Sequence, residues 1–328
     1  MDLVMRKAEK ADQTAVLALL NEVFSEGQRT ASKRDAAYWD WKFCDSPFGP
    51  SLLLVAESQG QLVAVNNWWS WSFSLRGKVL RAYQPCDTAV AKDFRGKGLF
   101  KTLRLEGLRM AREEGIGLIY NFPNQNSLPG YLSLGWHRQA SLPWMVRVLR
   151  PWAALRSFKA GGKTRSLPLE DAYLLQVDIL EEAGQQISPY DAVLRTHLVN
   201  GFFEWRYLQH PFRHYGMVAV SQGRKSCAAV FTVNEQGPHR ELVVVDLLGA
   251  PSLFPKVMQE VVGAGRHLGA NYVALMQNSF YGTAGLWRQG FVPYAYKNMV
   301  VLPLDWGLET QVRTYDRWSL VAGLHDSV

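Results

Sequence analysis

The sequence predicts an α/β (α+β) fold made of two similar units, each a mixed, mostly antiparallel and twisted sheet flanked by helices. Three observations predict it. Helical and strand-like apolar periods alternate along the chain, a distinctive aromatic run occurs twice, and the 328 residues exceed the length of one average domain. The composition, with 48% hydrophobic and 20% charged residues, excludes a disordered chain.

The repeated aromatic run is Tyr38–Phe43, which returns as Phe202–Tyr207 with every position keeping its residue class. A Pro-Phe pair follows each run, and strand-like sequence ending in Gln-Gly comes next in both copies. Asp87 and Asp246 then occupy corresponding strand positions. This similarity in fixed order predicts two copies of one unit. We therefore expect a first module at 1–149, a basic linker at 150–170, a second module at 171–304 and a tail at 305–328.

The elements of each copy follow in the order helix, antiparallel strands, helix, strand, helix. A 3.6-residue apolar period predicts the first helix, turns at Gln59-Gly60 and Arg76–Lys78 separate the strands, and Gly115 ends the second helix. The first copy is expected to have helices at 12–24, 98–114 and 127–134 and strands at 52–57, 61–75, 79–90 and 116–122. The second copy is expected to have strands at 216–221, 226–233, 241–248 and 271–276 and a helix at 253–268.

The net charge of +7 is concentrated in two segments. Lys92–Lys101 carries four positive charges and one negative, and Arg150–Leu169 carries five positive charges and no negative one. This distribution is unlike a diffuse nucleic-acid-binding surface, so nucleic acid is not the expected partner.

Targeting, membrane and metal signals are all weak in this sequence. The start lacks the apolar core of a signal peptide, and the apolar stretches are far shorter than the roughly 20 residues of a membrane span, so we expect a cytoplasmic protein. The three cysteines share no CxxC spacing, and Pro211 interrupts any helix that would align His210 with His214. No metal site is expected.

A candidate phosphate-binding loop follows the strand that ends at Val90. Gly96 and Gly98 allow a sharp turn and a close approach of the backbone to a ligand just before a helix. The free N–H groups and positive dipole end of that helix suit a pyrophosphate, and Lys97 and Lys101 add charge. A basic surface loop would share these features, and the pattern is neither a Walker loop nor a good Rossmann fingerprint.

The segment Arg95-Gly96-Lys97-Gly98 resembles the Arg-x-x-Gly-x-Gly/Ala motif of the GNAT acyltransferase superfamily, and Asn124–Trp136 resembles the second motif of that family. The resemblance covers residues 3–140, and the repeat is similar to tandem members of the family. It implies an N-acyltransferase that moves acetyl from acetyl-CoA directly to an amine of a small molecule, amino sugar or peptide. One departure is Phe100 at the last small position of the motif, whose ring must point away from the phosphates.

The resemblance also implies which residues react and bind. Tyr131 stands where the family places the hydroxyl that protonates the leaving thiolate, and Asn124 or Asn126 would bind the pantetheine arm. Asp87 is the candidate general base, although the equivalent Asp246 favours a structural role. The oxyanion and the pyrophosphate would be held by Ala89, Val90, Ala91, Arg95, Gly96, Lys97, Gly98, Leu99, Phe100 and Lys101.

An unusual strand carries Trp68, Trp69 and Trp71, which are expected either to form an aromatic wall for the acceptor or to pack internally. The second copy has Leu248–Pro255, with two prolines, where the loop should be, and Leu286 where the first has Tyr131. We therefore expect the second module to be inactive and to close the acceptor pocket.

Two alternatives remain open from the sequence. A Fem-type transferase would take its group from aminoacyl-tRNA and would use the basic linker to meet the phosphodiester backbone. A regulator would bind CoA without turnover. The acceptor and a possible homo-oligomer are also left open.

Overall fold

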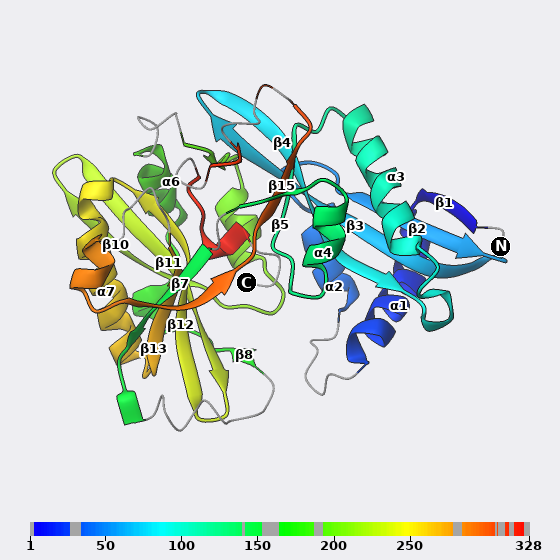
Figure 1. Ribbon diagram of the computed structural model, residues 1–328. Helices are drawn as coiled ribbons and strands as arrows, with labels where there is room; N and C mark the ends of the chain where they lie inside the picture. The colour runs from blue at the N-terminus through cyan, green and yellow to red at the C-terminus, as the bar shows by residue number, and fades with distance from the viewer. Residues whose placement is uncertain are drawn as a thin grey trace. The chain divides into compact units, whose positions relative to one another are not determined.

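The computed structural model describes residues 3–26, 34–139, 142–152, 164–186, 193–277, 284–305, 307, 312–314 and 318–324. The chain divides into two compact units. Unit 1 comprises 1–73, 79–138 and 300–310, and unit 2 comprises 74–78, 139–299 and 311–328. Each unit contains a mixed, mostly antiparallel sheet with helices beside it (Figure 1), which confirms the predicted fold class.

The sheet of unit 1 has the strand order β1-β2-β3-β4-β5-β15-β6, in which β4 and β5 are parallel. Its strands are β1 (Leu3–Lys7), β2 (Leu52–Ser58), β3 (Gln61–Leu75), β4 (Lys78–Val90), β5 (Leu118–Asn121), β6 (His137–Arg138) and β15 (Val300–Pro303). Its helices are η1 (Lys10–Asp12), α1 (Gln13–Ser25), α2 (Ala36–Trp39), η2 (Asp40–Cys44), η3 (Lys92–Phe94), α3 (Leu99–Glu113) and α4 (Leu128–Ser133).

The sheet of unit 2 has the order β10-β11-β12-β13-β7-β14, in which β12 and β13 are parallel. Its strands are β7 (Leu142–Val148), β8 (Arg165–Ser166), β10 (Gly216–Gln222), β11 (Lys225–Gln236), β12 (His239–Gly249), β13 (Tyr272–Met276) and β14 (Val292–Lys297). The short strand β9 (Arg195–Thr196) is not part of this sheet. Its helices are η4 (Asp171–Tyr173), α6 (Val177–Gln185), η5 (Glu204–Leu208), η6 (Pro251–Leu253), α7 (Phe254–His267), α8 (Ala284–Arg288) and η10 (Ala322–Leu324).

In both sheets, some neighbouring strands are far apart in the sequence. β15 pairs with β5 and β6 in unit 1, whereas β7 pairs with β13 and β14 in unit 2 (Figure 1). The predicted ranges differ here, because they keep the segment of β7 in the first module and that of β15 in the second. A domain boundary drawn as one continuous residue range fails here, because β7 and β15 each pair with strands that lie on the other side of that boundary.

The core of unit 1 lies on both faces of β3. Leu99, Leu103 and Leu108 of α3 pack in one hydrophobic cluster with Trp68. The Trp68 ring lies directly against Gly107, where an added Cβ would come within 2.3 Å of it. On the other face, Trp41 lies 6.2 Å from Trp69, ring centre to ring centre.

The repeated aromatic run forms a π-helical turn in both units. These turns are η2 and η5, and each is closed by a matching backbone hydrogen bond, Asp45 N to Asp40 O at 2.9 Å and Gln209 N to Glu204 O at 2.8 Å. The aromatic side chains Trp41 and Trp205 are both buried. The run therefore has the same local structure in both units.

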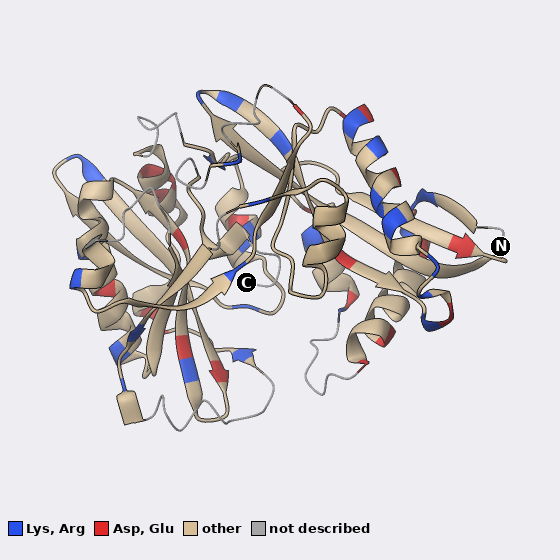
Figure 2. Cartoon of the chain, in the orientation of Figure 1, with Lys and Arg blue, Asp and Glu red and all other residues tan. Residues whose placement is uncertain are grey.

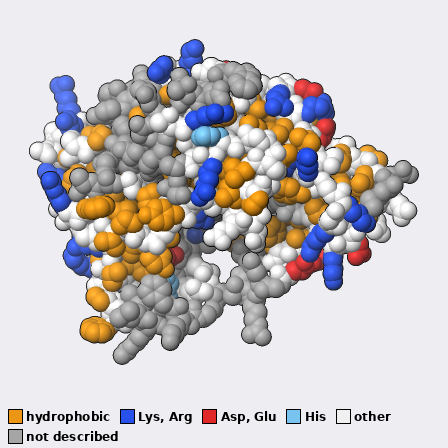
Figure 3. Space-filling model, in the orientation of Figure 1, with side chains coloured by type: hydrophobic (Ala, Val, Ile, Leu, Met, Phe, Trp, Pro, Cys, Tyr) orange, Lys and Arg blue, Asp and Glu red, His pale blue; other side chains and the backbone are white. Residues whose placement is uncertain are grey.

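Charged and hydrophobic side chains are unevenly spread over the surface. Positive side chains recur along α3, where Lys101, Arg109 and Arg112 are exposed (Figure 2). In unit 2, Tyr294 and Tyr296 of β14 are among the large hydrophobic side chains that stay exposed, and hydrophobic side chains are prominent on this unit in Figure 3. None of the helices in the described ranges has the length and apolarity needed to cross a membrane.

The linker and the tail are described only in part. Residues 153–163 of the predicted linker lie outside the described ranges, but Arg165 is in β8, which pairs with β11 and forms an ion pair with Glu235. In the tail, Trp318 is fully buried and donates its indole N–H to Val312 O at 3.0 Å. Two further aromatic residues of the tail, Trp306 and Tyr315, lie outside the described residues.

Candidate active site

The loop between β4 and α3 has the backbone that a close ligand contact requires. Gly96 and Gly98 have φ values of +74° and +79°, in the left-handed region that favours glycine. A Cβ at either position would meet nothing within 4 Å, so the space beside the loop is open. Gly98 is the N-cap of α3 and no side chain caps the helix, which leaves the N–H groups of its first turn to bind another group.

The loop also provides exposed positive charge. The side chains of Lys97 and Lys101 are exposed, and the Lys97 ammonium lies 4.9 Å from the centre of the Phe94 ring. Arg95 donates from Nε to Val90 O at 3.0 Å and forms a 2.6 Å ion pair with Glu26. Uncapped amides, a helix N-terminus and basic side chains together make a site that fits a pyrophosphate.

The end of β4 is bent away from β5. Among the described residues, their parallel pairing is confined to Ala82 with Leu118 and Tyr83 with Ile119. Further along β4, Asp87 has a φ of +41°, a left-handed conformation that is uncommon outside glycine. This kink precedes Thr88, Ala89 and Val90, which lead into the loop. The amide of Ala91 is already bonded to Val63 O at 2.9 Å, so it is not available to an oxyanion in this conformation.

Asp87 lies in a buried ion-pair network rather than facing an open site. Its two carboxylate oxygens accept from Arg34 Nε at 2.7 Å and from Lys42 Nζ at 2.8 Å. Burial raises the pKa of Asp87, but the adjacent charges of Lys42 and Arg34 and their hydrogen bonds outweigh it and lower the pKa to about 2. A carboxylate this acidic is a poor proton acceptor near neutral pH, which favours a structural role for Asp87 over that of general base.

Tyr131 is buried, and its hydroxyl lies in a network of polar side chains. The hydroxyl oxygen accepts hydrogen bonds from Arg104 Nη2 at 2.7 Å and from Asn121 Nδ2 at 2.5 Å. The orientation of the Asn121 amide is fixed because its Oδ1 accepts from the Phe122 amide at 2.8 Å. Pro129 falls in the first turn of α4, where a helix tolerates it.

Arg104 of α3 is a cation buried among aromatic rings. It is 2% exposed, and its guanidinium carbon lies 4.9 Å from the ring centre of Tyr131, 5.1 Å from Phe100 and 5.3 Å from Trp68. Nη2 also donates to Thr88 Oγ1 at 3.1 Å, while Nε and Nη1 have no hydrogen-bond partner within the described part of the chain. Burial lowers the pKa of Arg104, yet an arginine stays charged at neutral pH.

The other predicted binding residues are placed as follows. The Phe100 ring faces Tyr131 at 6.4 Å between ring centres, away from the exposed side of the loop. Asn124 Oδ1 accepts from the amides of Asn126 and Ser127 at 3.0 and 2.9 Å, so it organises the turn before α4. With its Oδ1 occupied in this way, the Asn124 side chain would contact a pantetheine arm through its Nδ2 hydrogens. The Asn126 side chain is exposed.

The three tryptophans of β3 are core residues. Trp68, Trp69 and Trp71 are 0%, 1% and 2% exposed. Trp69 and Trp71 contact each other edge to face at 5.0 Å, and Trp68 packs on α3. Their burial favours internal packing over an aromatic wall for an acceptor.

The loop of unit 2 lacks donors and charges that suit a pyrophosphate in unit 1. Pro251 and Pro255 have no N–H to offer, and Leu248–Pro255 contains no basic residue. The helix start is buried through Leu253 and Phe254. Unit 2 therefore lacks a phosphate-binding loop at this position.

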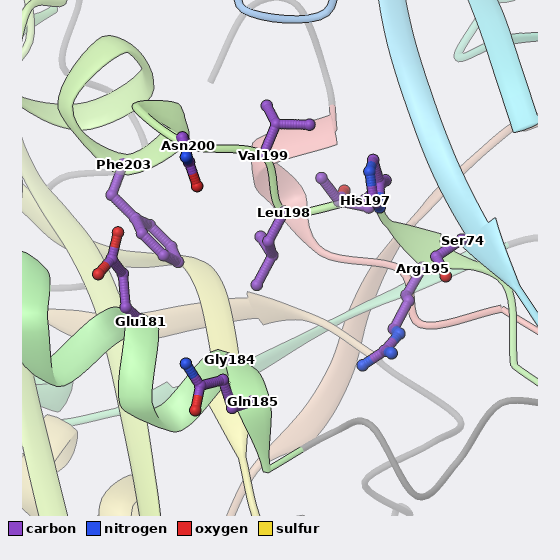
Figure 4. A pocket seen from close by; sticks show the side chains of 11 residues that line it. Ser74, Glu181, Gly184, Gln185, Arg195, His197, Leu198, Val199, Asn200 and Phe203 are labelled. Carbon is purple, nitrogen blue, oxygen red and sulfur yellow. The ribbon is translucent and has the colours of Figure 1, made fainter. Parts of the chain in front are cut away.

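Unit 2 has a cavity of its own, of about 480 Å³. Glu181 and Gln185 project from α6 on one side, and Arg195 and His197 lie on another (Figure 4). Burial and the charge of Arg195 lower the pKa of His197, which favours the neutral imidazole. None of the residues that we predicted for the site is among the described residues lining this cavity.

Comparison with known families identifies the first unit. Residues 4–138 match the family model described as the acetyltransferase (GNAT) domain. This stretch of the chain is a GNAT domain. The predicted resemblance is confirmed over this stretch, which belongs to a family of acyltransferases that use acyl-CoA. A search of curated proteins found no match.

Solved structures resemble the chain over most of its length. A GCN5-related N-acetyltransferase from Anabaena variabilis has a TM-score of 0.63 and 13% identity, over 92% of this chain and 72% of that one. A probable N-acyltransferase from Enterococcus faecalis has a TM-score of 0.61 and 10% identity, over 93% and 73%. Yeast (Saccharomyces cerevisiae) N-myristoyltransferase with bound myristoyl-CoA has a TM-score of 0.57 and 12% identity, over 92% and 82%. Identities this low show a shared fold alone.

Sequence reasoning missed Arg104 and Asn121 as neighbours of the GNAT-domain tyrosine. Arg104 occurs in a helix rich in basic residues, so nothing in its immediate sequence separates it from exposed Arg109 and Arg112. Its position in the helical period could have indicated burial, because Arg104 falls on the apolar face of the helix with Leu103, Gly107 and Leu108. Within the described residues, no group of three or more potential ligands could hold a metal ion.

Proposed function

We propose that the protein is an acetyl-CoA-dependent N-acyltransferase, in which unit 1 transfers the acetyl group directly to an amine of a small molecule, amino sugar or peptide. The observation that carries this proposal is the β4–α3 loop, with two left-handed glycines, an uncapped helix start and exposed basic side chains. The GNAT domain over the same residues gives the loop its expected ligand.

The residues of the chain would share three tasks. The amides from Gly96 to Lys101 would hold the pyrophosphate and so align the acyl group. A backbone N–H near Ala89 would stabilise the oxyanion that develops when the amine attacks. Tyr131 would give a proton to the departing sulfur. Acyl-CoA would supply the activated thioester.

A general base is not required for an amine that is already deprotonated when it binds, and its proton would pass to solvent. The ion-paired state of Asp87 agrees with this reading, since Arg34 and Lys42 occupy both oxygens of its carboxylate. Asn124 and Asn126 remain our candidates for the pantetheine arm.

The test starts with calorimetric titration of the whole chain with acetyl-CoA, followed by thiol release on a panel of amines. Gly98→Trp should weaken acetyl-CoA binding at least about tenfold, because its side chain fills the open space beside the loop. The matched control is Gly115→Trp at the other end of α3, since Gly115 has a similar φ of +70° and equally open surroundings. Equal loss in both variants, or no acetyl-CoA binding by the wild type, would reject the proposal.

The acyl group needs its own test, because one structural neighbour has myristoyl-CoA bound. A series from acetyl-CoA to myristoyl-CoA should give the highest kcat/KM with acetyl. A maximum at a long chain would replace the acetyl part of the proposal while keeping acyl transfer. Salt-sensitive binding of tRNA without CoA binding would instead favour the aminoacyl-tRNA alternative.

A further inference from the structure

Unit 2 provides a built-in comparison for the polar network around Tyr131. Pairs of equivalent backbone hydrogen bonds align the two units. The bond from Ala91 N to Val63 O at 2.9 Å corresponds to that from Ala250 N to Ser226 O at 2.8 Å. The bond from Ile116 N to Ala111 O at 3.0 Å corresponds to that from Ala270 N to Gly265 O at 2.8 Å. A third pair, Trp136 N to Tyr131 O and Phe291 N to Leu286 O, aligns the short helices. The positions in the two units can therefore be compared one by one.

The comparison shows that five polar residues of unit 1 are all apolar in unit 2. Asn66, Thr88, Arg104, Asn121 and Tyr131 correspond to Ala229, Leu247, Met258, Leu275 and Leu286. All five replacements lie in one hydrophobic core cluster. The fold is thus built without these polar groups in unit 2, so folding alone does not account for them in unit 1.

The five residues of unit 1 form one connected chain of hydrogen bonds. Thr88 Oγ1 donates to Asn66 Oδ1 at 3.2 Å and accepts from Arg104 Nη2 at 3.1 Å. Arg104 Nη2 and Asn121 Nδ2 then both donate to the Tyr131 hydroxyl oxygen. The chain spans β3, β4, α3, β5 and α4, and it ends on the hydroxyl that we propose as the proton donor.

Two donors on one phenol oxygen restrict what the hydroxyl can do. A tyrosine oxygen has two lone pairs and one proton. With Arg104 and Asn121 engaging the lone pairs, Tyr131 can interact with a third group only by donating its proton. A cation beside a phenol also stabilises the phenolate that remains after the proton has left. Both effects favour a proton donor.

We propose that Arg104, held by Thr88, is a positioning residue that commits Tyr131 to donating its proton and stabilises the resulting phenolate during acyl transfer. The inference rests on the proposed function. When the amine nitrogen bonds to the acyl carbon and the carbon–sulfur bond breaks, the sulfur leaves with the bonding electron pair. Tyr131 transfers its hydroxyl proton to that sulfur, which leaves as a thiol, and the phenolate regains a proton from solvent while the product amide loses the amine proton to solvent.

The burial of Arg104 supports this role. Its charge has no carboxylate partner among the described residues, and the groups whose charge acts on it are Tyr131 and the Cys86 thiol of β4. An unpaired buried charge costs stability, and apolar replacement of buried charges is often neutral or stabilising. Met258 at the corresponding position shows which replacement the fold accepts.

The experiment uses the whole chain with Arg104→Met, Arg104→Lys, Tyr131→Phe and the double variant Arg104→Met/Tyr131→Phe. Tyr131→Phe should lower kcat about 100-fold, and Arg104→Met should lower it at least about 10-fold with the acetyl-CoA dissociation constant within about twofold of wild type. Arg104→Lys, which keeps the charge, should lose less. The double variant should be no slower than Tyr131→Phe alone, because Arg104 acts through that hydroxyl. The matched control is Arg109→Met on the exposed side of α3, which should behave as wild type.

A second readout needs no substrate. The absorbance difference between wild type and Tyr131→Phe near 295 nm follows ionisation of this one phenol. In the Arg104→Met background, the corresponding difference should have its midpoint at higher pH, and the alkaline limb of kcat should move in the same direction. Asn121, Thr88 and Trp136 are neutral, so Cys86 is the other titratable group to control. Cys86→Ser should leave both midpoints unchanged.

The inference is overturned if Arg104→Met keeps the wild-type kcat, if its effect multiplies with that of Tyr131→Phe, if it weakens acetyl-CoA binding instead of kcat, or if the midpoints follow Cys86. Failure of the proposed function looks different, because the wild type would then bind no acetyl-CoA and release no thiol. The substrate-free titration still tests the link from Arg104 to Tyr131 in that case.

Discussion

Replacing Asp87 by asparagine separates a structural aspartate from a general base. The substitution keeps the shape of the side chain and removes the charge that Lys42 and Arg34 face at 2.8 and 2.7 Å. The Lys42 and Asp87 side chains are 1% and 4% exposed, so Lys42 would be left buried beside a neutral amide. Removing one partner of a buried ion pair costs about 3–5 kcal/mol. We therefore expect Asp87→Asn to lower the free energy of unfolding of unit 1 by about this amount.

The measurement is equilibrium urea unfolding followed by tryptophan fluorescence, because Trp41 and Trp69 lie close to the network. Asp45→Asn, an exposed aspartate just after η2, is the matched control and should unfold as wild type does. The double variant Asp87→Asn/Lys42→Met should lose less stability than the sum of the two single variants, since it removes both buried charges.

The effect should also depend on pH. The folded pKa of Asp87, about 2, lies below its unfolded value of about 3.9, so its contribution to stability is complete above that unfolded value. It is lost as the pH falls from there through the folded pKa. The difference in unfolding free energy between wild type and Asp87→Asn should therefore shrink between about pH 4 and pH 2. If Asp87→Asn unfolds at the wild-type urea concentration and yet loses kcat, Asp87 acts in catalysis and the structural reasoning is refuted.

Two other predictions follow from single contacts in unit 1. Glu26→Gln should tighten acetyl-CoA binding about two- to fivefold at low salt, because Glu26 competes for Arg95; calorimetry at low and high salt checks it, and an unchanged affinity at both would contradict it. Gly107→Ala should lower the free energy of unfolding by about 1–3 kcal/mol, since the new Cβ would overlap the Trp68 ring; urea unfolding measures it, with Gly263→Ala in the open surroundings of α7 as the control.

Much of the fold follows from local patterns. The helix predicted at 98–114 is observed as Leu99–Glu113, and Gly115 follows it with a φ of +70°. Apolar periodicity and glycine positions specify such elements because the responsible interactions lie within a few residues of each other. The loop at Arg95–Gly98 belongs to this class, since its function depends on local backbone conformation.

The sequence could not specify which strands pair over long distances. β7 and β15 are ordinary apolar strands, and nothing local indicates that β15 lies between β5 and β6 rather than beside β13. The chemistry of individual side chains was equally hidden. Asp87 has the spacing of a catalytic carboxylate, but its two cations come from η2 and from the segment before α2, which only folding brings to β4.

The two units separate residues that maintain the fold from residues that serve chemistry. Asp87 and Asp246 occupy equivalent strand positions, and both are held by the π-helical turn below them, through Lys42 in unit 1 and through the Tyr207 hydroxyl at 2.8 Å in unit 2. Burial raises the pKa of Asp246, and the hydrogen bonds from Tyr207 and the Leu247 amide and the charge of Arg206 oppose this rise only in part. The aspartate is therefore kept in both units, whereas the two cations bonded to it in unit 1 are not. An aspartate retained under such different electrostatics is explained by its shared hydrogen bond to the π-helical turn, which is a structural role. Arg104 shows the opposite pattern. In unit 2 its position is occupied by Met258, and the position of Tyr131 is occupied by Leu286. The two readings therefore predict opposite outcomes: Asp87→Asn should lose stability and keep kcat in the folded protein, whereas Arg104→Met should keep or gain stability and lose kcat.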